Sequence, residues 1–318
     1  MSKPFVRADV EMFLAFLNNI PGPKMHEMAP ADARAMMVGM RAVADVEVGA
    51  LGVIKNIAIP GPAGTIPARL YDVRPARSGP TPVMVFFHGG GFVIGDLDTH
   101  EPYCAEAARQ LDLPVIAVDY RLAPEHPFPA GPDDAEAAAR WIASSPDIFD
   151  FTVTGLIPSG DSAGGNLAIV TTMALRDHPA AVPVILQHPI YPVVSEHGAW
   201  PSMAAFADGF LLTAQGMSWF TNAYASDPNS WRAAPLRFNH VGMPPSFVTT
   251  ASLDPLRDQG HAYVAALEAA GVHTLHREAE GNIHGHINLA KGIPSSADDI
   301  RSNLTMLKTM LAKVMAPA

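Results

Sequence analysis

The chain of 318 residues is poor in cysteine and has no long apolar run. Its one cysteine, Cys104, excludes an intrachain disulfide and suits a reducing compartment. The first 20 residues carry Arg7, Asp9 and Glu11 among apolar residues, whereas a secretory signal needs an uninterrupted apolar core. No stretch approaches the roughly 18 consecutive apolar residues of a membrane span. We therefore expect a cytoplasmic protein without stable membrane insertion.

Positive charge is also scarce, since 21 Lys and Arg stand against 31 Asp and Glu, for a formal net charge of −10 at pH 7. Nucleic acids and anionic membranes select for basic patches, so this charge argues against both as partners. With 48% hydrophobic and 16% charged residues, the chain can bury a large core. We expect one large α/β domain with an accessory piece, as a monomer or a homodimer.

The N-terminal segment predicts two helices. Apolar residues at helical spacing predict an amphipathic helix over 6–19, and a second helix is expected from a cap at Asp32 to about Val43. Seven of the 15 methionines lie in the first 40 residues. Unbranched methionine side chains fill irregular cores and also adapt to varied ligands. Two interpretations therefore stay open, a gap-filling core and a pliable lid over an apolar ligand.

From about Ile54 the pattern changes to short apolar runs that alternate with helical stretches. Strands are predicted for VIKNIAI, ARLYDV, PVMVFFH, PVIAVDY, TGLIPSG, PVILQHPIY, SFVTTASL and HTLHREA. Helices are predicted near residues 99–111, 132–144, 163–176, 258–270 and 296–314. Continuous Val, Ile and Phe runs between helices are typical of a parallel sheet covered on both faces, and the first two runs suit an antiparallel edge.

Residues 193–241 interrupt this alternation with an aromatic-rich insertion. Its large aromatic side chains include Trp200, Phe206, Phe210, Trp219, Phe220, Tyr224 and Trp231. These rings either pack the insertion against itself and its neighbours or form the wall of a substrate pocket, since such pockets are largely apolar and aromatic.

A short motif supplies a candidate nucleophile. GDSAG at residues 160–164 matches G-x-S-x-G, with Ser162 at its centre. The five letters alone are weak evidence, but they stand between a predicted strand and the helical stretch NLAIVTTMALR. A nucleophile elbow needs that context, because the serine sits on a strained turn from strand to helix.

A glycine-rich segment supplies candidate hydrogen-bond donors. HGGG at residues 88–91 follows the strand PVMVFF, and glycines let backbone N–H groups approach a ligand closely. This suits an oxyanion hole, where N–H donors meet negative charge that develops on a substrate oxygen. A phosphate-binding P-loop is disfavoured because no G-K-[ST] follows.

A serine hydroxyl becomes an effective nucleophile only when a base removes its proton and an acid orients that base. In hydrolases built from alternating strands and helices, the acid follows the serine along the chain and the histidine base follows the acid. Asp254 ends the run SFVTTASL and is the candidate acid, whereas Asp258 better suits the start of the next helix. Two histidines on a glycine-containing loop, His284 and His286, are candidates for the base, with His284 preferred. The pair lacks an obvious third ligand for a metal, so we predict no metal and no other cofactor.

These motifs together resemble the hormone-sensitive-lipase family, called family IV among bacterial lipolytic enzymes. The resemblance rests on HGGGFVIGDLDTH at 88–100, DYRLAPEHPFPA at 119–130, GDSAGGNLA at 160–168, DPLRD at 254–258 and IHG at 283–285. It implies the α/β-hydrolase fold, with a mostly parallel mixed sheet of about eight strands flanked by helices. It also implies a catalytic domain of residues 46–192 and 242–318, under a helical cap made of residues 1–45 and 193–241.

The resemblance further assigns roles to single residues. It implies Ser162 as nucleophile, Asp254 as orienting acid and His284 as base. The oxyanion donors would be the N–H groups of Gly90, Gly91 and Ala163. Gly89 would shape this loop, and His88 would hold it.

Candidate pocket residues are Phe92, Asp161, Phe210 and His286. The family usually has an aromatic residue where this chain has His286, which makes the polarity of the neighbouring pocket a point to examine. Asp161 stands beside the nucleophile, and we expect it to brace nearby loops rather than to transfer protons.

The function implied is that of a carboxylesterase, which would hydrolyse short- to medium-chain acyl esters of small molecules through an acyl-enzyme. Amide, lactone and acylated-sugar hydrolysis on the same residues are alternatives. A ligand-binding protein without catalysis is a further alternative, which the presence of His284 disfavours. Fold alone licenses none of these choices, because one fold supports many functions.

Overall fold

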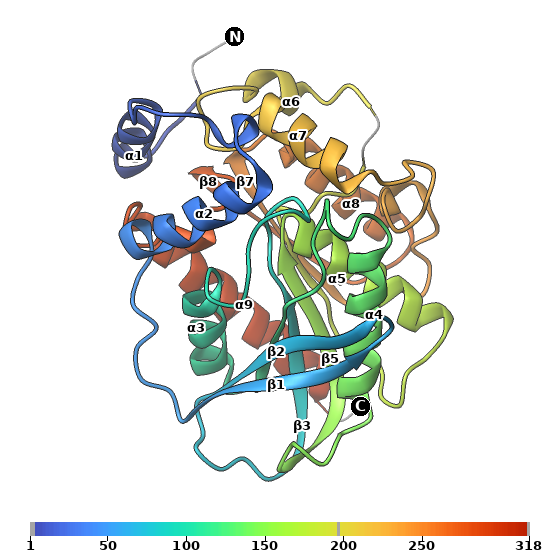
Figure 1. The fold of residues 1–318 in the computed structure, drawn as a ribbon. Helices are drawn as coiled ribbons and strands as arrows, with labels where there is room; N and C mark the ends of the chain where they lie inside the picture. Colours follow the sequence, from blue (N-terminus) through green and yellow to red (C-terminus); the bar gives the residue numbers. More distant parts are fainter. Residues whose placement is uncertain (1–3, 196–197, 317–318) are drawn as a thin grey trace.

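The structure, a computed structural model, describes residues 4–195 and 198–316. Its centre is a single eight-stranded sheet in the order β1-β2-β4-β3-β5-β6-β7-β8 (Figure 1). The strands are β1 (Val53–Gly61), β2 (Gly64–Asp72), β3 (Gly79–Phe87), β4 (Val115–Val118), β5 (Phe151–Asp161), β6 (His188–Ile190), β7 (Ser246–Leu253) and β8 (Thr274–Ile283). β1 pairs antiparallel with β2, β2 pairs antiparallel with β4, and the remaining pairs are parallel. The predicted antiparallel edge is therefore confirmed.

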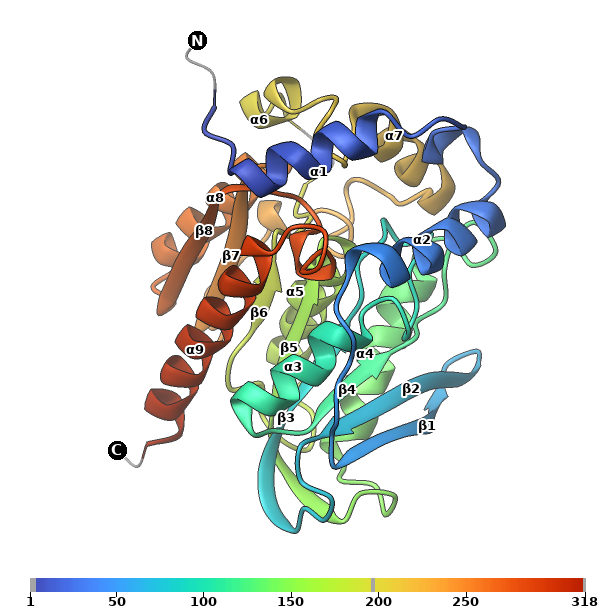
Figure 2. The same cartoon turned by 90° about the vertical axis from the view of Figure 1, so that its left-hand side faces the viewer.

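Helices cover both faces of this sheet (Figure 2). One face carries α3 (Glu101–Leu111) and α9 (Ser295–Met315), and the other carries α4 (Ala130–Ala143), α5 (Ala163–Asp177) and α8 (Arg257–Ala269). β3 explains the continuous apolar runs of the sequence. Its residues Val83 and Val85 pack toward α4 and α5, whereas Met84 and Phe86 pack toward α3 and α9. Each strand side chain thus meets an apolar helix face, and no polar side is needed.

Four further helices lie together above the carboxyl ends of the parallel strands (Figures 1 and 2). They are α1 (Ala8–Asn18), α2 (Pro30–Ala44), α6 (Pro201–Ala205) and α7 (Ala214–Tyr224), so they come from two segments far apart in the sequence. The two segments touch. Phe13 of α1 and Phe206 at the end of α6 share one apolar cluster, and the side-chain amide of Asn18 donates a hydrogen bond of 3.0 Å to the carbonyl of Gly209.

Local signals explain where the sequence predictions differ from the structure. The second helix begins at Pro30, whose fixed backbone suits the first helical position, and Asp32 lies in the first turn rather than at the cap. The predicted strand over residues 183–191 is regular only at His188–Ile190, and isolated bridges join Val184 and Gln187 to neighbouring chain segments. No helix in the described parts of the chain is both long and apolar enough to cross a membrane.

Candidate active site

Ser162 occupies a sharp turn between the end of β5 and the start of α5. Its backbone has φ 55° and ψ −116°, a left-handed conformation that is strained for a side chain with a Cβ atom. The flanking glycines are required by close packing. A Cβ atom on Gly164 would lie 1.9 Å from the carbonyl oxygen of Phe87, and one on Gly160 would lie 2.4 Å from that same oxygen. The G-x-S-x-G pattern therefore marks the strained turn that the sequence predicts.

The three predicted triad side chains meet in one chain of hydrogen bonds. His284 Nε2 lies 2.9 Å from Ser162 Oγ, and His284 Nδ1 lies 2.7 Å from Asp254 Oδ2. Asp254 is fully buried at the end of β7, and its other oxygen accepts a 2.7 Å hydrogen bond from the N–H of Leu256. The carboxylate is thereby held toward the imidazole, which itself faces the serine hydroxyl.

His286 lies outside this chain of hydrogen bonds. Its ring is fully buried, its Nδ1 is 3.0 Å from the carbonyl oxygen of Ile283, and its centroid is 5.3 Å from the ring of Tyr191. Burial is the main cause that lowers the pKa of His286 to about 4. Between the two candidate histidines, only His284 contacts both Ser162 and Asp254.

Asp258 has a structural setting, as expected for a residue at a helix start. It lies in the first turn of α8, accepts a 2.8 Å hydrogen bond from the N–H of Ser202 and forms an ion pair with Arg257. Burial raises the pKa of Asp258, but these hydrogen bonds and the guanidinium of Arg257 outweigh it and leave the pKa below its ordinary value.

The glycine loop after β3 presents backbone N–H groups near the turn of Ser162. In residues 4–195 and 198–316, the N–H groups of Gly90, Gly91 and Ala163 have no hydrogen-bond acceptor, whereas that of Gly89 donates to Asp161 Oδ1 at 2.7 Å. Gly90 and Gly91 have φ values of 120° and 58°, which favour glycine. The family resemblance implies that Gly90, Gly91 and Ala163 bind the oxyanion and that Gly89 shapes the loop, and these hydrogen bonds are compatible with those roles.

His88 braces this loop from below. Its Nδ1 lies 2.8 Å from the carbonyl oxygen of Gly89, and its ring stacks on Tyr120 with centroids 4.4 Å apart. The hydroxyl of Tyr120 donates a 2.7 Å hydrogen bond to the carbonyl of His88. Burial, followed by the charge of His100, lowers the pKa of His88 to about 4, so this ring is neutral at pH 7. These contacts agree with the expectation that His88 holds the glycine loop.

The cap helix α7 covers the loop from above. The ring of Phe220 lies so close that a Cβ atom on Gly91 would be 2.3 Å from it. Phe92 stacks on Tyr224 with ring centroids 3.9 Å apart, and the N–H of Phe128 donates to the carbonyl of Tyr224 at 3.0 Å. Sequence reasoning placed Phe220 and Tyr224 in the insertion but did not connect either with the glycine loop.

The four candidate pocket residues have unequal exposure. Phe210 keeps a partly exposed ring, which packs edge-on against Phe206 with centroids 5.0 Å apart. Phe92, Asp161 and His286 are buried, but Phe92 is as exposed as Ser162, at 8% each, so burial alone does not decide which of them contacts a substrate. The contact of these residues with a substrate therefore stays a prediction.

Asp161 lies beneath the glycine loop among hydrogen-bond donors. Burial raises its pKa, but His100 and the N–H of Gly89 outweigh this effect and hold the pKa below its ordinary value. Sequence reasoning did not assign buried His100, whose Nε2 lies 3.2 Å from Asp161 Oδ1, or half-buried Asn288, whose side-chain amide contacts His100. The sequence does offer a signal for His100, which is the last residue of the motif at 88–100. In the described part of the chain, no group of three or more His, Cys, Asp or Glu side chains is arranged to hold a metal ion.

Comparisons with known proteins agree with this geometry. A family described as alpha/beta hydrolase fold matches residues 84–288. The carboxylic ester hydrolase LipN of Mycobacterium tuberculosis is 39% identical over 270 residues, which cover 82% of this chain and 71% of LipN. The chain belongs to the α/β-hydrolase family. Within that family it is a member of the hormone-sensitive-lipase type of esterases, and its enzyme class is carboxylic-ester hydrolase.

Other members of the α/β-hydrolase family extend the match over almost the whole chain. The esterase LipI of M. tuberculosis is 37% identical over 81% of this chain and 82% of its own length. Among solved structures, LAE6, an α/β-hydrolase from the metagenome of Lake Arreo, superposes with a TM-score of 0.92 at 32% identity. That match covers 97% of this chain and 99% of LAE6. The predicted fold class is therefore confirmed.

Proposed function

We propose that the protein hydrolyses short- to medium-chain carboxylic esters through a covalent acyl-enzyme on Ser162. The observation that carries this proposal is the unbroken contact from Ser162 Oγ to His284 Nε2 at 2.9 Å and from His284 Nδ1 to Asp254 Oδ2 at 2.7 Å. A serine hydroxyl is a weak nucleophile until a neighbouring base removes its proton, and this contact supplies the base.

Acylation begins when Ser162 Oγ attacks the ester carbonyl carbon and its proton passes to His284 Nε2. Asp254 holds the Nδ1–H of His284 and stabilises the imidazolium that forms. The carbonyl oxygen becomes an oxyanion in the tetrahedral intermediate. When the bond to the leaving oxygen breaks, His284 gives its Nε2 proton to that oxygen and the alcohol departs, with the acyl group bound to Ser162.

Deacylation repeats these steps with water. His284 Nε2 takes a proton from the water as its oxygen attacks the acyl carbon, and then returns that proton to Ser162 Oγ as the acid leaves. The enzyme ends in its starting state, and one water is consumed for each ester. In this scheme all proton transfers pass through Nε2 of His284, while Nδ1 stays bonded to Asp254.

The oxyanion would be bound by the N–H groups of Gly90, Gly91 and Ala163. In the described residues these N–H groups donate to no other protein atom, so they are available to the oxyanion. They belong to fixed backbone, and donors fixed before the reaction need no reorganisation when charge develops. Ala163 also begins α5, and the positive end of a helix dipole favours negative charge there.

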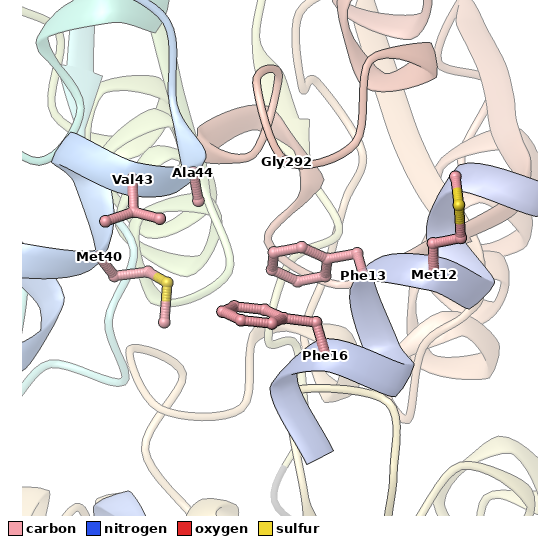
Figure 3. Close-up of a pocket in the computed structure, with 7 residues that line it drawn as sticks. All are labelled: Met12, Phe13, Phe16, Met40, Val43, Ala44 and Gly292. Atoms are coloured by element: carbon pink, nitrogen blue, oxygen red, sulfur yellow. The ribbon is translucent and has the colours of Figure 1, made fainter. Parts of the chain in front are cut away.

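We further propose that residues 1–45 and 193–241 together form the cap over this site, with residues 46–192 and 242–318 as the catalytic domain. The apolar cluster that includes Phe13 and Phe206, the hydrogen bond from Asn18 to Gly209 and the packing of Phe220 on Gly91 support one continuous cover. Figure 3 shows an apolar pocket of about 230 Å³ beside α1 and α2. It is lined by Met12, Phe13, Phe16, Met40, Val43, Ala44 and Gly292. Two methionines in this lining favour the lid interpretation of the methionine-rich segment.

An acyl-length series of simple aryl esters tests the proposal. We expect rapid turnover of short and medium acyl chains and a steep loss with long chains, together with a burst of alcohol release that reports the acyl-enzyme. A parallel panel of aryl amides, lactones and acylated sugars distinguishes the alternative hydrolases. Turnover of one of these at a higher kcat/KM than every ester would overturn the ester assignment, and no turnover of any of them would indicate a binding protein.

A further inference from the structure

His100 is a buried connection between two loops that carry the proposed chemistry. It immediately precedes α3, and only 1% of its surface is exposed. Its Nε2 lies 3.2 Å from Asp161 Oδ1 and 2.8 Å from the side-chain amide of Asn288. Asp161 in turn anchors the N–H of Gly89 in the glycine loop. Asn288 lies in the short helical turn after His284 (η3, His286–Asn288), so one imidazole touches the supports of both loops.

The other side of the ring is held by the preceding turn. Thr99 Oγ1 lies 2.9 Å from His100 Nδ1 and accepts a 2.9 Å hydrogen bond from the N–H of Asp96. The N–H of Thr99 donates to Asp96 Oδ1 at 2.8 Å and closes the turn. The imidazole is therefore held at Nδ1 by a hydrogen-bonded turn and at Nε2 by the two loop supports.

Nε2 faces both loop supports at close range. It lies 3.2 Å from Asp161 Oδ1 and 2.8 Å from the side-chain amide of Asn288. Loss of the ring would take this shared partner from a buried carboxylate and a half-buried amide, and hydrogen bonds left unmade by buried polar groups are costly.

Asp161 depends on its neighbours because it is a buried carboxylate, and a buried negative charge without partners is costly in a protein interior. Among the described residues its partners are the N–H of Gly89 at 2.7 Å, the ring of His100 at 3.2 Å and the hydroxyl of Tyr191, which donates at 3.4 Å. Removal of the His100 ring should therefore shift the carboxylate and, with it, the glycine loop that the carboxylate anchors.

We propose that His100 is a positioning residue that couples the glycine loop, through Asp161, to the loop of His284, through Asn288. This inference rests on the proposed function, because it assigns His100 to the support of the N–H donors and of the base. His100 touches neither the substrate nor the reacting atoms. Its loss should displace the oxyanion donors, which act in the transition state, and should therefore lower kcat more than it raises KM.

Variants of the full-length enzyme test the positioning role. We expect His100→Ala to lower kcat by about 100-fold, near the effect of losing one oxyanion donor, with KM changed by less than about threefold. His100→Gln keeps a neutral donor toward Asp161 and should recover about tenfold of that loss. The matched control is His188→Gln, because His188 is equally buried, contacts the carbonyl of Phe247 at 2.9 Å and, in the described residues, forms no hydrogen bond or ion pair with Asp161 or Asn288. It should leave kcat unchanged.

A second variant keeps the inference testable if His100→Ala fails to fold. Asn288→Ala removes one of the two supports and keeps the ring, so we expect it to lower kcat by about tenfold with KM changed by less than about threefold. A folded His100→Ala or Asn288→Ala with the kinetics of the His188→Gln control would overturn the proposal. Absence of ester turnover in the wild type would instead contradict the proposed function.

Discussion

The floor and the cover of the site are built from different kinds of contact. At the floor, Ser162, His284 and Asp254 are 8%, 7% and 0% exposed, and each is fixed by hydrogen bonds at the end of a strand. The cover is held mainly by apolar packing, and its surface includes Met12 and Phe16, which are 68% and 58% exposed. Reactive groups are thus held where rotation is most restricted, and adaptable side chains lie where a substrate would approach.

This contrast predicts two different effects of mutation on the enzyme. Loss of a floor side chain should stop the chemistry without disturbing the fold, since each triad member is one part of a bond-making unit. Loss of part of the cover should change access, water exclusion and chain-length preference while the triad stays intact. The following predictions test this separation, beginning with the largest effect.

The largest effect is expected for Ser162→Ala. This change deletes only the nucleophile, so kcat for a short aryl ester should fall by about 10⁴-fold or more, while circular dichroism and thermal unfolding stay close to wild type. A purified variant that keeps more than a few per cent of wild-type activity would show that another residue is the nucleophile.

The two neighbouring histidines should differ sharply. His284→Ala removes the base and should lower kcat by about 10³- to 10⁴-fold, because Ser162 Oγ then has no proton acceptor. His286→Phe replaces a ring that contacts only Ile283 and Tyr191 among the neighbours named above, so the triad should still work. Steady-state kinetics of both variants provides the measurement, and the reverse pattern would transfer the base to His286.

Removal of the N-terminal part of the cover should have an intermediate effect. Deletion of residues 1–45 takes away α1 and α2 and should reduce turnover by about tenfold, lower solubility and alter chain-length preference, because water then enters the site and apolar surface is exposed. Circular dichroism and kinetics over short and long acyl chains measure these changes. A truncated enzyme that is soluble, folded and unchanged in rate and preference would contradict the cap proposal.

The smallest effect on ester turnover is expected at Asp45, which follows the last residue of α2 where the cover meets the catalytic part of the chain. Burial is the main cause that raises its pKa to about 6, from 3.8 for an unperturbed aspartate. As pH rises between these values the unfolded chain releases its proton first, so the free energy of unfolding should fall by about 2 to 3 kcal/mol and stay low above pH 6.

Asp45→Asn removes this titration. The variant should match wild type near pH 4 and exceed its stability by about 2 kcal/mol at pH 7, as measured by urea unfolding at both pH values. Ester turnover should change little, because Asp45 lies outside the triad. Parallel pH profiles of stability for the two proteins would contradict this account of Asp45.

Local pattern was sufficient to predict the elements but not the contacts between them. β3 was readable because residues 83–87 are all buried and apolar, and β7 was readable from its short run of buried apolar and small residues. The triad was predictable because chain order and strand ends constrain it. The bond between His100 and Asn288 joins residues 188 positions apart, and the packing of Phe220 on Gly91 joins a cap helix to a distant loop. Neither leaves a periodic signal in the sequence, since both depend on how the layers stack.

The most direct test of the account is covalent labelling with an aryl organophosphonate, followed by intact-mass and peptide mass spectrometry. A base-activated serine beside oxyanion donors should react once per chain, with the adduct on the peptide that contains Ser162. Ser162→Ala should take up no label, and His284→Ala should react far more slowly than wild type. An adduct on another residue, or equal labelling of wild type and Ser162→Ala, would contradict the assignment of Ser162 as the activated nucleophile.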